Sequence, residues 1–203
     1  MVRDGFPYVV APVVLSLPPA FFGYWPITLG LLVVAGFMAF FFRDPRRTVP
    51  TEPGIVVAPA DGRVTVVKRA DGQNAESLVS IFLSPLDVHI NRAPISGEIM
   101  EIAYKRGKFL MATNRKARLL NEQNTLTIRG SEVTVSCTQI AGILARRIVC
   151  WKREGERVEC GERFGMIKFG SRTDVVMPSS VEIVVEEGMH VRGGVTIIGR
   201  ITK

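Results

Sequence analysis

The hydrophobic pattern of the chain changes once, near residue 43. Residues 5–42 contain no Asp, Glu, Lys, Arg or His, and apolar residues follow one another there without alternation. Beyond residue 54, short runs rich in β-branched residues are separated by glycines and polar turns. A long uncharged run is typical of a membrane segment, whereas short runs of this kind indicate β-strands. The pattern predicts an N-terminal hydrophobic segment followed by a mainly β domain.

The hydrophobic segment is too long for one membrane-spanning helix. As a helix its 38 residues would extend about 57 Å, against ~30 Å of bilayer hydrocarbon. Pro18-Pro19 and Pro26 divide it, because proline removes a hydrogen-bond donor and clashes with the preceding helical turn. We expect a helix from Pro26 to Phe42 that pairs with the shorter first segment in a shallow hairpin. A single full span is the alternative.

Positive charges flank the hydrophobic segment on both sides. Arg3 precedes it, and Arg43, Arg46 and Arg47 follow it, which places both of its ends on the cytoplasmic side of a membrane. No A-x-A cleavage site precedes the later arginines, so a membrane anchor is favoured over a cleaved signal peptide. The expected location is therefore the cell membrane, with the following domain on the cytoplasmic face.

Three parts are expected along the chain. Residues 1–42 form the anchor, residues 43–53 a basic, proline-rich linker, and residues 54–203 the main domain. The spacing of the β-type runs in that domain indicates a β-sandwich or a barrel-like fold. Residues 108–123 hold either a helix or a long loop, so an α+β fold is the alternative.

Composition narrows the class of partner. Lys and Arg number 26 against 19 Asp and Glu, which gives a net charge of +7. A basic protein favours acidic partners such as nucleic acid or anionic lipid, and the uncharged segment favours lipid. We therefore expect a membrane partner and no nucleic acid.

Cysteine and histidine are too few for a metal or disulfide framework. The chain has three cysteines without a C-x-x-C spacing and only two histidines. An odd number of cysteines at this spacing argues against both a disulfide scaffold and a zinc knuckle. We expect no metal, and a reducing, cytosolic environment for the main domain.

Three clusters of residues could carry chemistry, and each also has a purely structural interpretation. In "APADGRV", Asp61 precedes a glycine and suits a two-residue turn between strands. In "SPLDVHINRAP", His89 is either a buried core residue or a general base. In "KFGSR", Gly170-Ser171 is either a strand end with a turn or a site of chemistry on the chain itself. A serine hydrolase is disfavoured, because Thr173 stands where the nucleophile elbow requires glycine.

Taken together, the motifs point to one family. The segments "FFRDP", "APADGRV", "SPLDVHINRAP", "NEQN" and "KFGSR" occur in this order and resemble phosphatidylserine decarboxylase proenzymes of the short bacterial and archaeal form. The resemblance implies a carboxy-lyase that converts phosphatidylserine to phosphatidylethanolamine. It also implies a precursor that cuts itself between Gly170 and Ser171 into a β chain, residues 1–170, and an α chain, residues 171–203.

The same resemblance implies the cofactor and the catalytic residues. Ser171 becomes a covalently attached pyruvoyl group, which forms a Schiff base with the substrate, so neither metal nor pyridoxal phosphate is expected. His89 is implied as the base and Asp61 as its orienting carboxylate, in the manner of a Ser-His-Asp triad. Long-form members carry a second histidine where Arg92 stands, so it is open whether His89 serves both maturation and decarboxylation.

Further residues are candidates for binding the anionic phospholipid substrate. Arg92, Arg115 and Arg172 suit its phosphate or carboxylate, since arginine can clamp either with two hydrogen bonds; solvated surface arginines are the alternative. Asn121, Glu122 and Asn124 belong to the "NEQN" motif, whose role the sequence does not explain. Beyond the α and β chains we expect a further homo-oligomer.

Two other functions remain open at this point. An archaetidylserine decarboxylase would use the same mechanism on an ether lipid with the same headgroup. A membrane-tethered lipoyl- or biotinyl-like binding module is suggested by "VVAPADGRV" and "EEGMHVRGGVTII", which resemble the outer strands of such domains. That module requires a lysine at a hairpin tip, and neither Lys68, Lys105 nor Lys108 stands in such a pattern.

Overall fold

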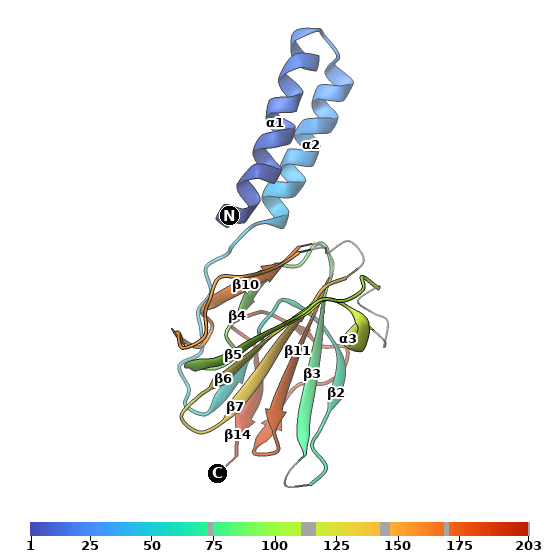
Figure 1. The fold of residues 1–203 in the computed structure, drawn as a ribbon. Coiled ribbons are helices and arrows are strands. Elements are labelled where there is room, and N and C mark those ends of the chain that lie inside the picture. Colours follow the sequence, from blue (N-terminus) through green and yellow to red (C-terminus); the bar gives the residue numbers. More distant parts are fainter. Residues whose placement is uncertain (73–74, 111–116, 143–146, 169–170, 203) are drawn as a thin grey trace. The chain divides into compact units, whose positions relative to one another are not determined.

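The computed structural model describes residues 1–72, 75–110, 117–142, 147–168 and 171–202. The chain divides into two compact units, Met1–Arg46 and Arg47–Lys203. The first unit is helical and the second is built mainly of strands (Figure 1). The expectation of a mainly β main domain is therefore confirmed.

The helical unit is a hairpin of two helices. After the 3₁₀ turn η1 (Arg3–Gly5), helix α1 (Phe6–Phe21) and helix α2 (Trp25–Phe41) lie side by side. The predicted break at Pro18-Pro19 is wrong, because α1 continues through both prolines. Proline lacks a donor but keeps its carbonyl, and Pro18 O and Pro19 O accept hydrogen bonds from Phe22 N and Tyr24 N at 3.0 and 2.7 Å. The chain reverses just beyond them.

Both helices of the hairpin expose large apolar side chains. Leu17, Phe21, Trp25, Leu29 and Val33 are all largely exposed. Pro26 occupies the first turn of α2, close to the predicted helix start. In the part of the chain that the structure describes, no helix is both long enough and apolar enough to cross a membrane.

The described residues of the second unit form one large antiparallel sheet and two small ones. The large sheet has eight strands in the order β13-β2-β3-β11-β7-β6-β5-β9, and the small sheets have the orders β1-β14-β12 and β4-β10-β8. The strands are β1 (Ile55–Val57), β2 (Gly62–Lys68), β3 (Glu76–Leu83), β4 (Ile90–Arg92), β5 (Gly97–Lys105), β6 (Gln123–Arg129), β7 (Thr134–Ile140), β8 (Ile148–Cys150), β9 (Arg157–Val158), β10 (Arg163–Ile167), β11 (Ser171–Pro178), β12 (Val181–Ile183), β13 (His190–Val191) and β14 (Ile197–Ile201).

Within residues 108–123 the described helical structure is short. Helix α3 spans only Ala117–Leu120. The predicted helix at this place thus has a single turn, and the unit remains mainly β.

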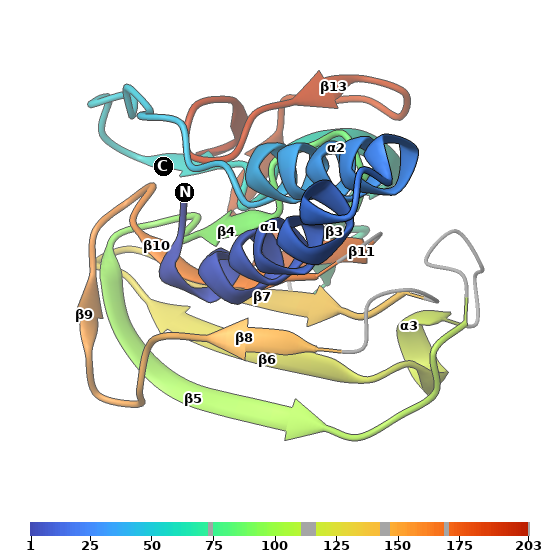
Figure 2. The same ribbon diagram turned by 90° about the horizontal axis from the view of Figure 1, so that it is seen from above.

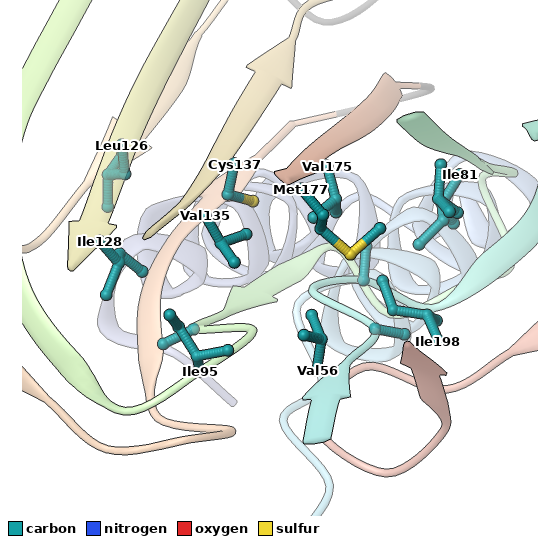
Figure 3. Packing of buried hydrophobic residues seen from close by; sticks show 14 of the residues in the cluster. Val56, Ile81, Ile95, Leu126, Ile128, Val135, Cys137, Val175, Met177 and Ile198 are labelled. Carbon is teal, nitrogen blue, oxygen red and sulfur yellow. The ribbon is translucent and has the colours of Figure 1, made fainter. Parts of the chain in front are cut away.

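The core lies on one side of the large sheet. Val175 and Met177 of β11 point into it, opposite Val56 of β1 and Ile198 of β14, as Figure 3 shows. Side chains along a strand alternate between its two sides. We call the side of the large sheet that carries Ser171, Thr173, Val175 and Met177 the inner face, and the side that carries Arg172 and Asp174 the outer face.

The turn predicted at Asp61-Gly62 does not join neighbouring strands. Strand β1 pairs with β14 in a small sheet, whereas β2 begins at Gly62 and pairs with β3 in the large one. A Cβ atom on Gly62 would lie 2.1 Å from Phe82 O, and its φ is +147°. Glycine is therefore needed here for close backbone approach and not for a hairpin turn.

Candidate active site

Ser171 is the first residue of β11, a central strand of the large sheet. Strand β11 lies between β3 and β7, and Ser171 pairs with Leu83. The side chain is 0% exposed, and its Oγ has no hydrogen-bond partner among the described residues. Buried hydroxyls are normally hydrogen-bonded, so an unpartnered one marks a position with a purpose other than stability.

The chain changes sheets immediately before Ser171. Strand β10 ends at Ile167 in the sheet with β4 and β8, and β11 begins at Ser171 in the large sheet. Figure 1 shows β4 and β10 at the end of the large sheet where β11 begins, and Figure 2 shows the same strands from above. The predicted cleavage residue Gly170 lies outside the described residues.

His89 is buried directly before β4, and its surroundings fix its tautomer. Its Nδ1 lies 3.0 Å from the carbonyl oxygen of Asp87. Because a carbonyl only accepts hydrogen bonds, Nδ1 carries the proton in the neutral ring, and Nε2 keeps its lone pair. The Asp87 carboxylate accepts bonds from Ser84 N and Ser84 Oγ at 2.8 and 2.7 Å, which fixes this loop. His89 therefore has the tautomer that a general base at Nε2 requires.

The strands place His89 and Ser171 at the same end of the site. Strand β4 runs antiparallel to β10, and His89 O accepts a hydrogen bond from Ile167 N, so β4 starts where β10 ends. Strand β11 starts at the same crossover. Farther along both strands, Asn91 Nδ2 donates to Thr173 Oγ1 at 3.0 Å. Because residues two apart share a side of a strand, Ser171 lies on the side of β11 that faces β4, and we expect the same orientation of His89, which directly precedes β4.

Asp61 has other partners than the predicted one. Its Oδ2 accepts a hydrogen bond from Arg47 Nη2 at 2.6 Å, and its Oδ1 accepts one from Gly193 N at 2.8 Å. Among the described residues the Asp61 carboxylate has no other hydrogen-bond partner, so it is not hydrogen-bonded to His89. The Arg47 side chain is only 12% exposed and belongs to this cluster, not to an exposed basic patch beside the hydrophobic segment. The orienting role of Asp61 stays a prediction.

Comparison with known proteins decides the family. The family model for phosphatidylserine decarboxylase matches residues 34–199. The chain belongs to the phosphatidylserine decarboxylase family. It is 45% identical to a phosphatidylserine decarboxylase proenzyme of Pelodictyon phaeoclathratiforme, over 86% of this chain and 82% of the relative. A protein of the same name from Symbiobacterium thermophilum is 45% identical over 98% of this chain and 94% of its own length. The expectation of a decarboxylase proenzyme family is confirmed.

Within this decarboxylase fold, Arg172 lies on the other side of the sheet from Ser171. Its Nε and Nη2 donate to the two carboxylate oxygens of Asp174 at 2.6 and 3.2 Å, and Nη2 also donates to Ser80 Oγ at 2.7 Å. Arg118 of α3 lies 3.3 Å from the same carboxylate. Strand alternation therefore separates Arg172 from Ser171, although the two are neighbours in sequence.

The other predicted arginines have different surroundings. Arg92 is buried, and its Nη1 donates to Gly161 O at 3.0 Å. Arg115 lies outside the described residues. Strand alternation also directs Arg92 away from the side of β4 that carries His89 and Asn91. Arg92 thus lies on the side of β4 that is turned away from β11. Arg172 likewise lies on the side of β11 that is turned away from β4.

The "NEQN" motif has a structural basis that the sequence did not reveal. Asn121 Oδ1 accepts a bond from Leu110 N, and its Nδ2 donates to Leu110 O and Ala141 O, all at 2.7 to 2.9 Å. Asn121 therefore ties three chain segments together.

The other two candidate residues of the motif contact neighbouring strands. Partial burial of Tyr104 and the neighbouring Glu122 carboxylate raise the pKa of the Tyr104 hydroxyl. Asn124 is buried and donates to Gln139 Oε1 at 3.0 Å.

Sequence analysis missed two residues near the site, Gln139 and Thr173. Both are fully buried on the inner face, among mostly apolar side chains. The sequence feature that could have revealed them is a polar residue within an otherwise β-branched run. Burying an unpaired polar group is costly, so such a residue is expected to have a hydrogen-bond partner or a function.

The residues present fit a pyruvoyl group formed from Ser171. The decisive observation is the buried Ser171 Oγ without a partner among the described residues, because a nucleophile that is hydrogen-bonded for stability would resist attack on a neighbouring carbonyl. Within those residues no group of three or more His, Cys, Asp or Glu side chains is arranged to hold a metal ion.

Proposed function

We propose that this protein decarboxylates phosphatidylserine to phosphatidylethanolamine, using a pyruvoyl group that it makes from its own Ser171. One observation carries the proposal. The buried Ser171 Oγ, which has no partner among the described residues, stands at a crossover between two sheets, on the side of β11 that faces β4, the strand directly after His89. Family membership supplies the reaction class, and this arrangement supplies the chemistry of maturation.

Maturation begins with an attack of Ser171 on the preceding carbonyl. His89 Nε2 takes the hydroxyl proton as Oγ adds to the Gly170 carbonyl carbon, and the amide C–N bond breaks to leave an ester and a free Ser171 amine. Removal of the Ser171 α-proton then breaks the Cβ–Oγ bond and releases the Gly170 carboxylate. The dehydroalanine that remains takes up water and loses ammonia to give the pyruvoyl group. Gly170 suits this step, because glycine permits backbone angles that other residues disfavour.

The two chains remain joined after the cut. The segment after Ser171 supplies β11, which pairs with β3 on one side and β7 on the other. It also supplies β14, which pairs with β1. These ladders and the apolar core hold the smaller chain in place without a covalent link, and they keep the new terminal group buried.

In turnover the chain's own residues position the reacting groups and supply a proton to the product. When present, the pyruvoyl carbonyl supplies the group that binds the substrate amine and accepts the electron pair left by carbon dioxide. His89 holds the proton that returns to the α-carbon of the product. Burial of position 171 excludes water from the reacting centre.

We propose further that the helical hairpin attaches the enzyme to the cytoplasmic face of the cell membrane. Its two helices carry no charged residue between Gly5 and Phe42 and expose large apolar side chains. Such a surface is suited to the interfacial and acyl region of a bilayer. Arg43 and Arg46 follow directly, where anionic lipid would attract them. The substrate is itself a membrane lipid, so attachment brings the site to it.

Intact mass and an assay on vesicles test the proposal together. Purified protein is expected to give two chains, the smaller beginning at residue 171 and lacking a free amine, and to form phosphatidylethanolamine from phosphatidylserine vesicles. The Ser171→Ala variant is expected to remain one chain without activity. An uncut wild-type chain that forms the product would contradict the proposal. Vesicles of the ether-linked lipid in parallel establish the lipid class.

A further inference from the structure

We propose that four buried side chains, Asn124, Gln139, Asn91 and Thr173, form a hydrogen-bonded positioning network that sets the separation of His89 from Ser171 for self-cleavage. The inference rests on the proposed self-cleavage and gives it a structural determinant. The four residues come from β6, β7, β4 and β11 and so connect two different sheets.

The network is continuous. Asn124 Nδ2 donates to Gln139 Oε1 at 3.0 Å, Gln139 Nε2 donates to Asn91 Oδ1 at 2.9 Å, and Asn91 Nδ2 donates to Thr173 Oγ1 at 3.0 Å. All four side chains are buried. An amide chain of this length inside a core is costly unless each member is satisfied, so its geometry is tightly determined.

The network has one direction. Asn124, Gln139 and Asn91 each donate from the side-chain NH₂ group to the next residue. The side-chain oxygens of Gln139 and Asn91 each accept from the residue before.

The network ends at a hydroxyl close to the reacting residue. Thr173 Oγ1 accepts from Asn91, and its own proton has no acceptor among the described residues. Thr173 stands two residues after Ser171 on the same side of β11, and Asn91 stands two residues after His89 on β4. The hydrogen bond between Asn91 and Thr173 thus lies one step along the strands from the catalytic pair.

Side-chain contacts, not a backbone ladder, set the distance between β4 and β11. Strands β4 and β11 belong to different sheets and share no backbone ladder, so their distance depends on the groups between them. The amides are neutral across the working pH range, and therefore hold the strands without competing for the proton of His89. An error of about 1 Å in such a placement can slow a reaction on the order of 100-fold.

Two substitutions at Thr173 test the network. Thr173→Val removes the hydroxyl at nearly constant volume, and Thr173→Ser keeps it. We expect self-cleavage of the folded, newly synthesised precursor to be roughly 10- to 100-fold slower in Thr173→Val and close to wild type in Thr173→Ser. The measurement is a pulse-labelled time course of the two chains on a denaturing gel, with precursor folding checked by its urea unfolding midpoint.

A matched control lies on the outer face of the same sheet. Thr138 Oγ1 shares a hydrogen bond of 3.0 Å with Thr125 Oγ1 between β7 and β6. Thr138→Val therefore removes a comparable hydroxyl contact away from Ser171, and its self-cleavage should be unchanged. Gln139→Met interrupts the network at its centre, so its self-cleavage should be as slow as that of Thr173→Val. It replaces Thr173→Val as the test if that variant does not fold.

The outcomes separate this inference from the proposed function. If the wild-type chain is not cut, the proposed function itself fails. If the wild type is cut and folded Thr173→Val and Gln139→Met are cut at the same rate, the positioning network is overturned. Slow cutting in Thr138→Val as well would equally overturn it, since any hydroxyl loss in the sheet would then have the effect.

Discussion

The two faces of strand β11 carry buried polar groups of opposite character. On the outer face, Arg172 and Asp174 form a charged pair with two hydrogen bonds, and Ser80 and Arg118 add further contacts. On the inner face, a neutral chain of amides ends at Thr173, and Ser171 beside it has a hydroxyl without a partner among the described residues.

This difference distinguishes a structural cluster from the proposed reactive one. A buried charge is tolerated only when it is paired, and the outer cluster pairs its charges closely. On the inner face, the Ser171 hydroxyl has no hydrogen-bond partner among the described residues, and the strand that faces it, β4, directly follows His89. Two adjacent residues, Ser171 and Arg172, thus have unrelated roles because they point in opposite directions.

The largest expected effect comes from replacing a serine on each face with alanine. Ser171→Ala should abolish chain cleavage completely, because it removes the proposed nucleophile. Ser80→Ala, at an equally buried serine of the neighbouring strand β3, should leave cleavage intact and lower the free energy of unfolding by about 1–3 kcal/mol through the loss of a partner for Arg172. Gel analysis and urea unfolding measure the two effects, and loss of cleavage in Ser80→Ala would remove the distinction between the faces.

The next largest effect concerns stability on the outer face. Asp174→Asn leaves the buried Arg172 without its charge partner, and we expect the free energy of unfolding to fall by about 3–5 kcal/mol. Glu98→Gln breaks the exposed pair with Arg129, whose closest atoms are 3.6 Å apart, and should change it by less than about 1 kcal/mol. Urea unfolding of both variants checks this, and equal effects would mean that the outer pair is not structural.

An intermediate effect is expected from crowding the inner network. A Cβ atom on Gly165 would lie 2.2 Å from Val149 O and 3.0 Å from Gln139 Nε2. Gly165→Ala should therefore lower the free energy of unfolding by about 1–3 kcal/mol and slow chain cleavage. Gly36→Ala is the control, because beyond its chain neighbours and the adjoining backbone of its own helix no atom lies within 4 Å of the added Cβ. A stable, normally cut Gly165→Ala variant would show that the network tolerates displacement.

The buried thiol of the inner face predicts a pH dependence. Burial, and secondarily the charge of Asp174, raises the pKa of the Cys137 thiol. The unfolded chain loses this proton above a pKa of about 8.5 while the folded chain keeps it, so stability present below that pH is lost as pH rises. From pH 8 to 10 the free energy of unfolding should fall by at most about 1.4 kcal/mol per pH unit for this thiol. In Cys137→Ala that thiol's share of the decline should vanish, and an identical decline would refute the assignment.

The smallest expected effect is that of Arg118 at the edge of the outer cluster. Its side chain is 41% exposed, so solvent screens its attraction to Asp174. Arg118→Ala should lower the free energy of unfolding by less than about 1 kcal/mol and leave cleavage unchanged. Urea unfolding beside Asp174→Asn gives the comparison, and a loss as large as in that variant would show that Arg118 is an essential member of the cluster.

Local pattern predicted the kinds of element better than their connections. The β-type runs became strands, and the uncharged segment became two helices, because both follow from periodicity and propensity. The break at Pro18-Pro19 and the turn at Asp61-Gly62 were wrong. The carbonyls of both prolines still accept hydrogen bonds from Phe22 and Tyr24, so the helix continues through them. The glycine at position 62 is explained by the approach of Phe82 from another strand.

The sequence by itself determined the family. Its ordered motifs also predict Ser171 as the nucleophile and His89 as the base, since such predictions depend on residue type and order along the chain. Only the tertiary structure decided which neighbours share a face, that Arg47 and Gly193 bind Asp61, and that Asn124, Gln139, Asn91 and Thr173 meet between two sheets. Such contacts depend on the pairing of strands far apart in sequence, and a one-residue change of register would exchange Ser171 and Arg172 between the two faces.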